Sequence, residues 1–210
     1  MPWIDCFTAP CKGGCPIAQD IPEYMELCNK GLYGPALKLI TEKNPLPFLT
    51  GTICAHRCQT KCSRNFYDES VRIRDTKLLA AQKGYNALMA SIKLPERVAG
   101  KKVAIIGGGP AGLSCAYFLA IQGYKPTVFE KNERPGGMLR YGVPSFKLEK
   151  DVIDAEIDVL RELGVDIHCG VDVGRDVTLA QLREQGYKAF YIAIGCQGGR
   201  KAGVPGEDAA

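Results

Sequence analysis

The sequence predicts an α/β protein in which a small all-α, cysteine-rich domain precedes a Rossmann-like domain built on a parallel sheet. Seven of the ten cysteines lie before residue 63, where apolar residues recur at helical spacing. From residue 101 onward, short apolar runs typical of buried strands alternate with amphipathic helical segments. This alternation predicts parallel strands joined by right-handed crossovers.

The cysteines of the first domain form two triplets with short spacings. The first triplet is spaced C-x4-C-x3-C and is followed directly by a proline, and the second is spaced C-x3-C-x3-C. Several thiolates at such spacings on turns are typical of metal or cluster ligands. The six predicted ligands are Cys6, Cys11, Cys15, Cys54, Cys58 and Cys62.

A helical hairpin is predicted between the two triplets, so the triplets can converge at one of its ends. Its second helix ends at the Asn-Pro-Leu-Pro stretch 44–47, because proline lacks a donor and restricts the residue before it. Cys28 falls on the apolar face of the first helix and is expected in the core. The predicted helices are 21–30, 33–42 and 75–92, with a short extended piece over 71–73.

The residues alone leave four explanations for the triplets. Disulfides are disfavoured where thiols stay reduced. Zinc is disfavoured because the usual C-x2-C pair is absent and His56 is the only histidine nearby. Iron–sulfur clusters fit best, since they need several thiolates on short irregular loops, often with a proline after a ligand. Free thiols without metal are the fourth explanation.

The second domain opens on a glycine-rich turn between a strand and a helix. Residues 103–106 form a fully apolar run, and Gly107, Gly109 and Gly112 follow at G-x-G-x-x-G spacing. These glycines permit a tight turn, close approach of a pyrophosphate and close packing of the helix, whose N-terminus favours phosphate. Glu130 lies 18 residues after Gly112 (130 − 112), where a carboxylate can accept from ribose hydroxyls. The stretch therefore predicts a dinucleotide site.

The chain after Glu130 continues the alternation of helices and strands. The Arg-Pro-Gly-Gly loop 134–137 is expected to bring backbone close to whatever the first glycine turn holds, and residues 139–148 are expected to be irregular. Thr178 or Asp176 is the expected cap of the last helix. Cys115, Cys169 and Cys196 are expected to be buried, and His168 structural. The predicted elements are a helix over 151–163, a strand over 165–169, a helix over 178–185 and a buried strand over 189–194.

Length and composition narrow the function classes. The 210 residues suit one or two domains, and a net charge of +4 is too small to indicate a nucleic-acid partner. No apolar run approaches the roughly 18 residues of a membrane span, and the N-terminus lacks the features of a signal peptide. We expect a cytoplasmic protein, with domains over 1–94 and 101–210 and a polar linker over 95–100.

Three stretches of the second domain resemble the flavin domain of the glutamate synthase small-subunit family, which includes the N-terminal part of dihydropyrimidine dehydrogenase. They read VAIIGGGPAGLSCA, FEKNERPGGMLRYGVPSFKL and YIAIG. The cysteine region, with IPEY, NPLP and C-x3-C-x3-C, is similar to the iron–sulfur domain that precedes the flavin domain in that family. Within the family, the chain is most similar to stand-alone members described as selenate-reductase subunits. The resemblance covers essentially the whole chain.

The resemblance implies FAD in the second domain and two [4Fe–4S] clusters in the first. One cluster would use Cys6, Cys11 and Cys62, and the other Cys15, Cys54 and Cys58. The implied FAD contacts include the stretch 131–138. The individual residues implied as FAD contacts are Gly107, Gly108, Gly109, Pro110, Ala111, Gly112, Glu130, Lys131, Gly136, Gly137, Met138, Lys147, Val173 and Gly195.

Two positions depart from the family pattern. The fourth thiolate of the first cluster would stand three residues before Cys6, and that residue is Trp3. The Glu or Gln that completes the second cluster matches Lys77, whose ammonium cannot ligate. Each cluster thus keeps three cysteines, although Asp5 could supply an oxygen to the first.

The resemblance implies an electron-transfer oxidoreductase, in which hydride from NAD(P)H reaches FAD and single electrons leave through iron–sulfur clusters. No side chain need act as a catalytic acid or base. The alternative is a non-catalytic docking module of a larger oxidoreductase, with a metal-poor cysteine domain. The residues after Gly195 contain no second G-x-G-x-x-G. We therefore expect a partial flavin domain, completed by a partner subunit or by the rest of the polypeptide, and a chain that alone is flavin-poor and does not oxidise NAD(P)H.

Overall fold

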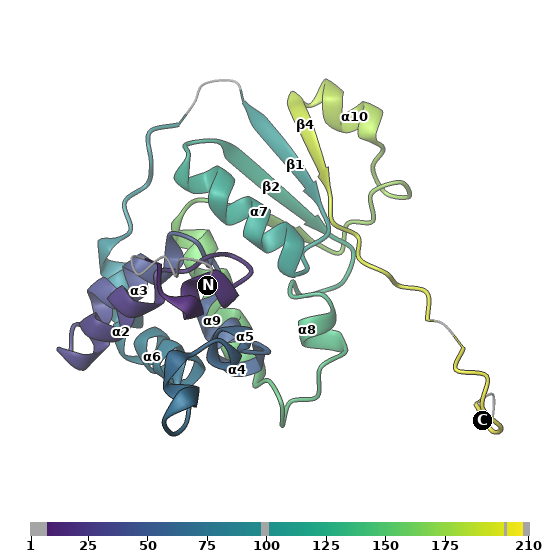
Figure 1. Ribbon diagram of the computed structural model, residues 1–210. Helices are drawn as coiled ribbons and strands as arrows, with labels where there is room; N and C mark the ends of the chain where they lie inside the picture. The colour runs from purple at the N-terminus through teal and green to yellow at the C-terminus, as the bar shows by residue number, and fades with distance from the viewer. Residues whose placement is uncertain (1–7, 98–100, 200, 208–210) are drawn as a thin grey trace.

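Short helices make up the N-terminal region of the protein (Figure 1). The computed structural model describes residues 8–97, 101–199 and 201–207. α6 is the longest helix and packs against α2, α3 and α4. The helices of this region are α1 Pro10–Gly14, α2 Ile21–Asn29, α3 Tyr33–Thr41, α4 Pro47–Ile53, α5 Arg57–Thr60, the 3₁₀ helix η1 Ser63–Phe66 and α6 Ile73–Ser91.

The three helices predicted for this region are confirmed as α2, α3 and α6, to within two residues at each end. The extended piece predicted over 71–73 is wrong, because Ile73 already begins α6 and no strand is assigned there. Helices α1, α4, α5 and η1 were not predicted. In α4 the cause is clear: Pro47, predicted only as part of the break after the second helix, stands in the first turn of a new helix, where its missing N–H costs nothing.

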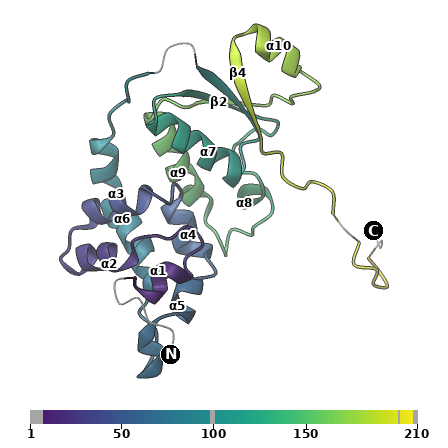
Figure 2. The same ribbon diagram turned by 45° about the horizontal axis from the view of Figure 1, so that its top comes forward.

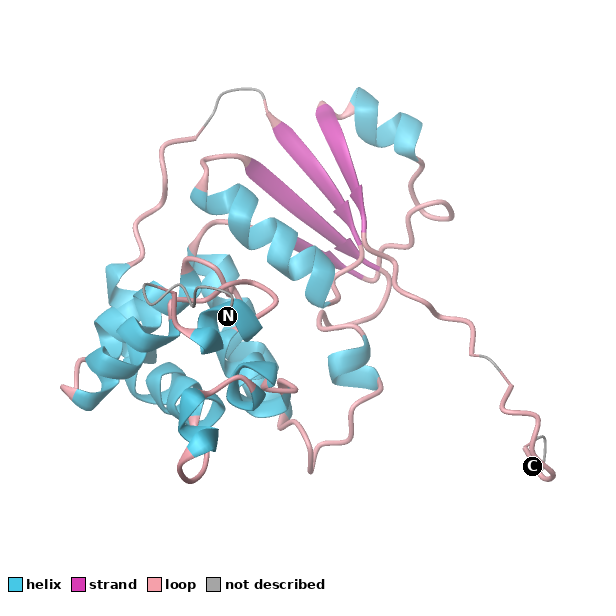
Figure 3. Ribbon diagram, viewed as in Figure 1, coloured by secondary structure: helices cyan, strands magenta, loops and turns pink. Residues whose placement is uncertain are grey.

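The second region is built on a parallel sheet, as predicted, and the sheet has four strands in the order β3-β2-β1-β4. Figure 3 shows its strands in magenta, apart from the cyan helices of the N-terminal region. Side chains alternate between the faces of the sheet. Val103, Ile105 and Val128 pack on the side of α7 and α9, whereas Ala104 and Phe129 pack on the side of α10. The elements are β1 Lys102–Ile106, α7 Pro110–Ile121, β2 Lys125–Glu130, α8 Met138–Tyr141, α9 Lys150–Glu162, β3 Asp166–Cys169, α10 Leu179–Glu184 and β4 Tyr187–Ile192.

Two predictions about burial in this region are wrong. The strand predicted as buried over 189–194 is the exposed strand β4, because it lies at the edge of the described sheet, where the short α10 and α7 leave most of it uncovered. Cys169 and Cys196 are exposed and Cys115 is half-buried. His168 is exposed too, and its ring stacks on Phe129 with centroids 5.6 Å apart. Thr178 is confirmed as the cap of α10, where it forms a capping box with Gln181.

The two regions share one apolar core, and α4 lies against α9 (Figure 2). Leu49 of α4 and Leu160 of α9 belong to this core. Between them Glu156, only 2% exposed, accepts the backbone N–H of Leu49 at 3.1 Å through Oε1. Burial raises the pKa of the Glu156 carboxyl to about 8, although the backbone N–H donors of Leu49 and Phe48 lower it. A buried acid thus joins the two halves.

Arg97 anchors the predicted linker to the sheet region. Its guanidinium donates to the carbonyl oxygens of Tyr124, Leu163 and Gly164 at 2.6, 2.8 and 3.2 Å. Arg97 thus binds the segments that directly follow α7 and α9. Residues 98–100 of the linker lie outside the described residues. Among the described helices, none has the length and apolarity that crossing a bilayer requires.

Candidate functional site

A cavity of about 790 Å³ lies at the carboxyl ends of β1, β2 and β4. Ligands of open α/β sheets bind at this edge, outside the carboxyl ends of the strands. The N-terminus of α7 contributes to the wall, and Pro110 occupies its first turn. The first amides of a helix have no acceptor within it, and no side chain caps this end. The cavity is therefore built to receive an anionic group.

The three glycines of the turn have different reasons to be glycine. Gly107 has a φ of +107°, and a Cβ there would collide with the carbonyl oxygen of Ala193. A Cβ on Gly112 would collide with the carbonyl oxygen of Gly107. Gly109 is different: its φ is −77°, and a Cβ would meet only the Cα of Gly137, at 3.9 Å. The fold itself thus requires the outer two glycines, but not Gly109.

The second glycine pair lies against the first glycine turn. Gly136 donates its N–H to the carbonyl oxygen of Gly108 at 2.8 Å. Both glycines of the pair have positive φ, +126° at Gly136 and +53° at Gly137. A Cβ on Gly137 would stand 2.9 Å from the Cα of Gly109, so the two backbones touch. Two loops far apart in sequence therefore form one wall of the cavity.

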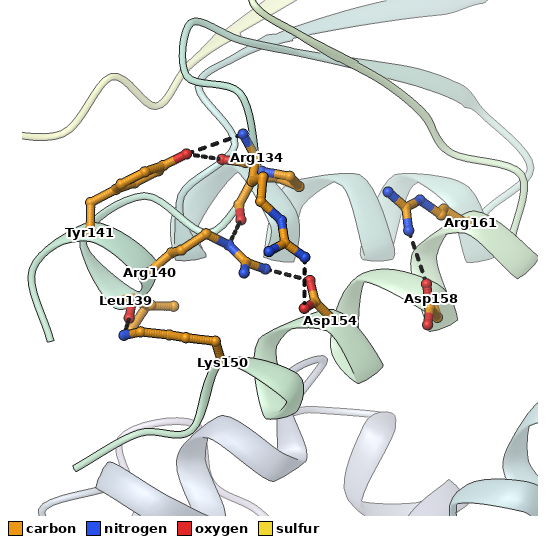
Figure 4. A network of polar contacts seen from close by, with 9 residues as sticks. Arg134, Leu139, Arg140, Tyr141, Lys150, Asp154, Asp158 and Arg161 are labelled. Atoms are coloured by element: carbon orange, nitrogen blue, oxygen red, sulfur yellow. Dashed lines mark hydrogen bonds and ion pairs between the residues drawn. The ribbon is translucent and has the colours of Figure 1, made fainter. Parts of the chain in front are cut away.

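A network of charged groups holds the second loop on α9 (Figure 4). Asp154 of α9 accepts from Arg134 at 3.1 Å and from Arg140 at 2.5 Å. Arg140, buried in α8, also donates from Nε to the carbonyl oxygen of Pro135 at 2.8 Å. The Tyr141 hydroxyl accepts the N–H of Arg134 at 3.1 Å. Asp154 thus braces the loop from outside the cavity.

Glu130 reaches the cavity wall but is engaged by the protein itself. Its Oε2 accepts the N–H of Gly108 at 2.6 Å, and its Oε1 accepts the backbone and side-chain N–H groups of Asn132 at 2.9 and 2.6 Å. The carboxylate, 4% exposed as a residue, therefore ties the end of β2 to the glycine turn. A ribose contact, as predicted for Glu130, would be an additional role.

The structure brings most of the predicted dinucleotide-site residues to this cavity. Gly108, Gly112 and Gly136 shape the turns behind the wall, and Lys147 is exposed on a loop that does not line it. Asp172 and Gln197 line the cavity and were missed, although each follows a strand. Asn132, which belongs to the implied stretch 131–138, lines it as well. The predicted residues that do line it are Gly107, Gly109, Pro110, Ala111, Glu130, Lys131, Gly137, Met138, Val173 and Gly195.

A second cavity, of about 200 Å³, brings Cys15, Cys54 and Cys58 together. The family resemblance assigns these three cysteines to one cluster. Electrostatic interactions link Cys58 with the other two, and link Cys11 with Cys62 and with Cys15. Burial raises the pKa of the Cys11 and Cys58 thiols. Both proposed groups thus have described members near one another, while Cys6 lies outside the described residues.

The backbone near this second cavity is strained at two points. Ala18 has a φ of 47° and His56 a φ of 42°, and they are the two non-glycine residues with positive φ in the described chain. His56 donates its backbone N–H to Cys54 Sγ at 3.4 Å, so the strained turn places a donor on a thiol. Left-handed non-glycine residues persist where the surroundings impose them, often at ligand sites.

The alternatives of disulfides and a single metal ion find no support in the described residues. All nine described cysteines are free thiols, and Cys28 is a core residue as predicted. No three described His, Cys, Asp or Glu side chains are arranged to hold one metal ion. An iron–sulfur cluster is larger than one ion, and its thiolates bind separate irons, so it needs a wider spacing of ligands.

Two protein-family models match the sequence. The model of the dihydropyrimidine dehydrogenase domain II with a 4Fe–4S cluster matches residues 3–87. The model of the NAD(P)-binding Rossmann-like domain matches residues 105–165. The first ends within α6, and the second runs from β1 to the start of β3. The predicted order, an iron–sulfur type of domain followed by a Rossmann-like domain, is confirmed.

Curated relatives match nearly the whole chain. NADPH-Fe(3+) oxidoreductase subunit beta of Geobacter sulfurreducens is 36% identical, over 98% of this chain and 31% of that protein. The oxidoreductase YgfK of Escherichia coli is 39% identical, over 93% of this chain and 19% of that protein. The glutamate synthase (NADPH) small chain of Bacillus subtilis is 35% identical, over 98% of this chain and 43% of that protein. The chain thus spans less than half the length of these relatives.

Proposed function

Because the chain belongs to the family of the glutamate synthase small chain, in which an iron–sulfur type of domain precedes a Rossmann-like domain, we propose that it is part of an electron-transfer oxidoreductase. Electrons would pass between NAD(P)H, FAD and iron–sulfur clusters toward a partner subunit or acceptor. Two relatives carry NADPH in their names, which favours NADPH as the source. The free thiols favour the cytoplasm.

The large cavity is the proposed site of FAD, and Gly109 is the observation that carries this proposal. A side chain at Gly109 would fit the fold, so the glycine is explained by a ligand that approaches the backbone there. The α7 amides would bind the pyrophosphate, and the second glycine loop would close over it. When bound, FAD supplies the conversion between hydride transfer and single-electron transfer.

The protein's own residues would bind, orient and shield this cofactor. Gly107 and Gly137 keep the backbone open, while Lys131 and Met138 flank the cavity. Glu130 keeps the turn in place through the N–H of Gly108, at 2.6 Å. None of these groups needs to transfer a proton, so catalysis would consist of placing the flavin and setting its surroundings.

The six cysteines of the triplets are the proposed cluster ligands. Cys15, Cys54 and Cys58 line one cavity, which fits one cluster. Cys11 lies near Cys62, and Cys6 would complete their set. Cys58→Ser and Cys11→Ser should each lower the iron content of anaerobically prepared protein, and independently. Loss of all iron in either variant would indicate one shared site, and stoichiometric zinc without sulfide would overturn both clusters.

Gly109→Ala tests the flavin site. Its methyl group meets nothing closer than 3.9 Å, so the unfolding free energy should change by less than about 0.5 kcal/mol. Its affinity for FAD, measured by quenching of flavin fluorescence, should fall at least about tenfold, since about 1.4 kcal/mol of lost contact suffices. Gly13→Ala is the control, because Gly13 lies in α1 and a Cβ there would meet no atom within 4 Å. Equal FAD affinity in Gly109→Ala and the parent would refute this assignment.

The alternative proposal, a non-catalytic docking module, makes a different prediction for the pure protein. Such a module would contain little iron and sulfide even when prepared without oxygen. The electron-transfer proposal instead requires that the pure protein absorb at about 400 nm and contain sulfide, as iron–sulfur proteins do.

A further inference from the structure

The cavity that holds Cys15, Cys54 and Cys58 is also lined by cations and hydrogen-bond donors. Lys77, Arg74 and Gln19 contribute to its wall. Among the described residues that line it, none is Asp or Glu. The surroundings of the three thiols thus suit a group with negative charge.

Lys77 is the most unusual member of this wall. It is only 5% exposed, although lysine is almost never fully buried unless it is paired. Its electrostatic neighbours are the three thiols of the cavity, together with Arg74. As an ammonium group, Lys77 has three donors and no lone pair, so in this form it cannot bind iron. In this form it can balance negative charge and donate hydrogen bonds.

Gln19 provides a second, independent observation. It is 4% exposed, it lines the same cavity, and its amide Nε2 is buried with no hydrogen-bond partner among the described residues. An unpaired buried donor lowers stability, because its hydrogen bonds to water are lost and not replaced. A bound group with sulfur acceptors would satisfy this donor. The orphaned amide therefore points to a ligand in the cavity.

We propose that Lys77 and Gln19 take the place of a fourth protein ligand, so that the cavity holds an iron–sulfur group through three thiolates and balances its charge with the ammonium. This inference rests on the proposed function, because it takes iron and sulfide as the occupant. Iron–sulfur clusters are commonly held by four ligands. One iron therefore keeps a position for a small anionic ligand from solution, such as a thiolate, and the nearby cation favours an anion there.

The test isolates this site in the full-length chain. Replacing Cys6, Cys11 and Cys62 by serine leaves Cys15, Cys54 and Cys58 as the remaining members of the triplets. This background is loaded anaerobically with iron and sulfide and titrated by EPR against solution potential. It is compared with the same background carrying Lys77→Met. Lys83→Met is the matched control, because Lys83 lies on the same helix but is exposed.

Loss of the ammonium disfavours the more negative, reduced form. At a fixed potential, Lys77→Met should therefore shift the ratio of oxidised to reduced cluster at least tenfold toward oxidised, about 59 mV for one electron. Lys83→Met should leave the ratio unchanged. Gln19→Leu should shift it in the same direction as Lys77→Met, because a donor to sulfur is lost. Gln19→Leu also removes the orphaned amide, so it carries the test if Lys77→Met fails to fold.

A second measurement addresses the open position. Added thiol should change the visible spectrum of the loaded background, and Lys77→Cys, which supplies a ligand, should abolish this response. If neither Lys77→Met nor Gln19→Leu shifts the ratio and added thiol has no effect, the inference is overturned, while bound iron and sulfide leave the proposed function standing. If the parent chain takes up no iron and sulfide, both are overturned.

Discussion

The two cavities of the protein are built by opposite means. The glycine turn of the large cavity is shaped by backbone: two glycine loops in contact and a helix N-terminus, with a carboxylate that binds the turn. The wall of the small cavity is side chains: three thiols, a buried ammonium and an unpaired amide, next to two strained residues. The large cavity leaves the first amides of α7 for a ligand, whereas the small cavity leaves a buried charge and a buried amide, whose costs a ligand would offset.

This difference predicts that the two cavities respond unequally to their ligands. Loading iron and sulfide should protect the amides of α1 and α5 from hydrogen exchange, since a ligand at a thousandfold excess over Kd contributes about 4 kcal/mol. Loading FAD should change the exchange of the α7 amides less, because the sheet holds that helix in place already. Mass spectrometry of exchange, with and without iron and sulfide and with and without FAD, measures both. Equal protection of α1 by iron and sulfide and of α7 by FAD would remove the contrast.

Glu156 tests whether the two regions unfold together. Because burial raises its pKa from 4.5 to about 8, the folded state binds more protons than the unfolded state between these pH values. The contribution of Glu156 is therefore most favourable below pH 4.5 and is lost as pH rises to about 8.

Glu156→Gln keeps an acceptor for Leu49 and cannot ionise. At pH 9 it should raise the unfolding free energy by up to roughly 4 kcal/mol relative to the parent, and the advantage should shrink toward pH 5. Urea unfolding across this pH range, followed in both regions, measures the effect. Glu162→Gln, at the exposed end of α9, is the control. An advantage that is independent of pH would contradict the assignment.

The glycine turn should show which glycines the fold requires. Gly112→Ala forces a methyl group onto the carbonyl oxygen of Gly107, so we expect a loss of about 2–3 kcal/mol. Gly109→Ala should lose much less, and the difference between the two separates fold from ligand. Thermal unfolding without FAD measures both. Similar melting temperatures for the two variants would mean that the turn adapts to a side chain.

The smallest effect is expected at the brace of the second loop. Asp154→Ala removes the partner of Arg134 and of buried Arg140, but Asp154 is about one third exposed, so the loss should be only about 1 kcal/mol. FAD affinity should fall about fivefold as the loop loosens. Asp158→Ala removes the exposed ion pair with Arg161 and should change neither the unfolding free energy nor the affinity for FAD. Unchanged FAD affinity in Asp154→Ala would show that the loop needs no brace.

Much of the sheet region could be predicted because its signals are local. Apolar runs bounded by glycine mark the strands, and the spacing of Gly107, Gly109 and Gly112 marks the turn. The wrong predictions concern features that depend on residues elsewhere in the fold. Pro47 was predicted only as a helix breaker, but it starts α4. β4 is rich in apolar residues but exposed, because burial depends on what covers a strand.

The small cavity was predictable only in part. The cysteine spacing predicted metal chemistry, and the family resemblance grouped Cys15 with Cys54 and Cys58, as the structure groups them. Gln19 gave no signal, because a glutamine is ordinary on any surface. Lys77 was identified as unable to ligate, but not as a buried charge.

The sequence by itself determined the order of the two domains, the parallel sheet, the glycine turn and the identity of the thiols. These follow from periodicity and spacing, which act over a few residues. Only the tertiary structure decided that Glu156 is buried between α9 and α4, that Asp154 braces the second loop, and that Lys77 and Gln19 face the three thiols. Burial and the pairing of charges depend on residues that are distant in the chain, and folding alone brings these together.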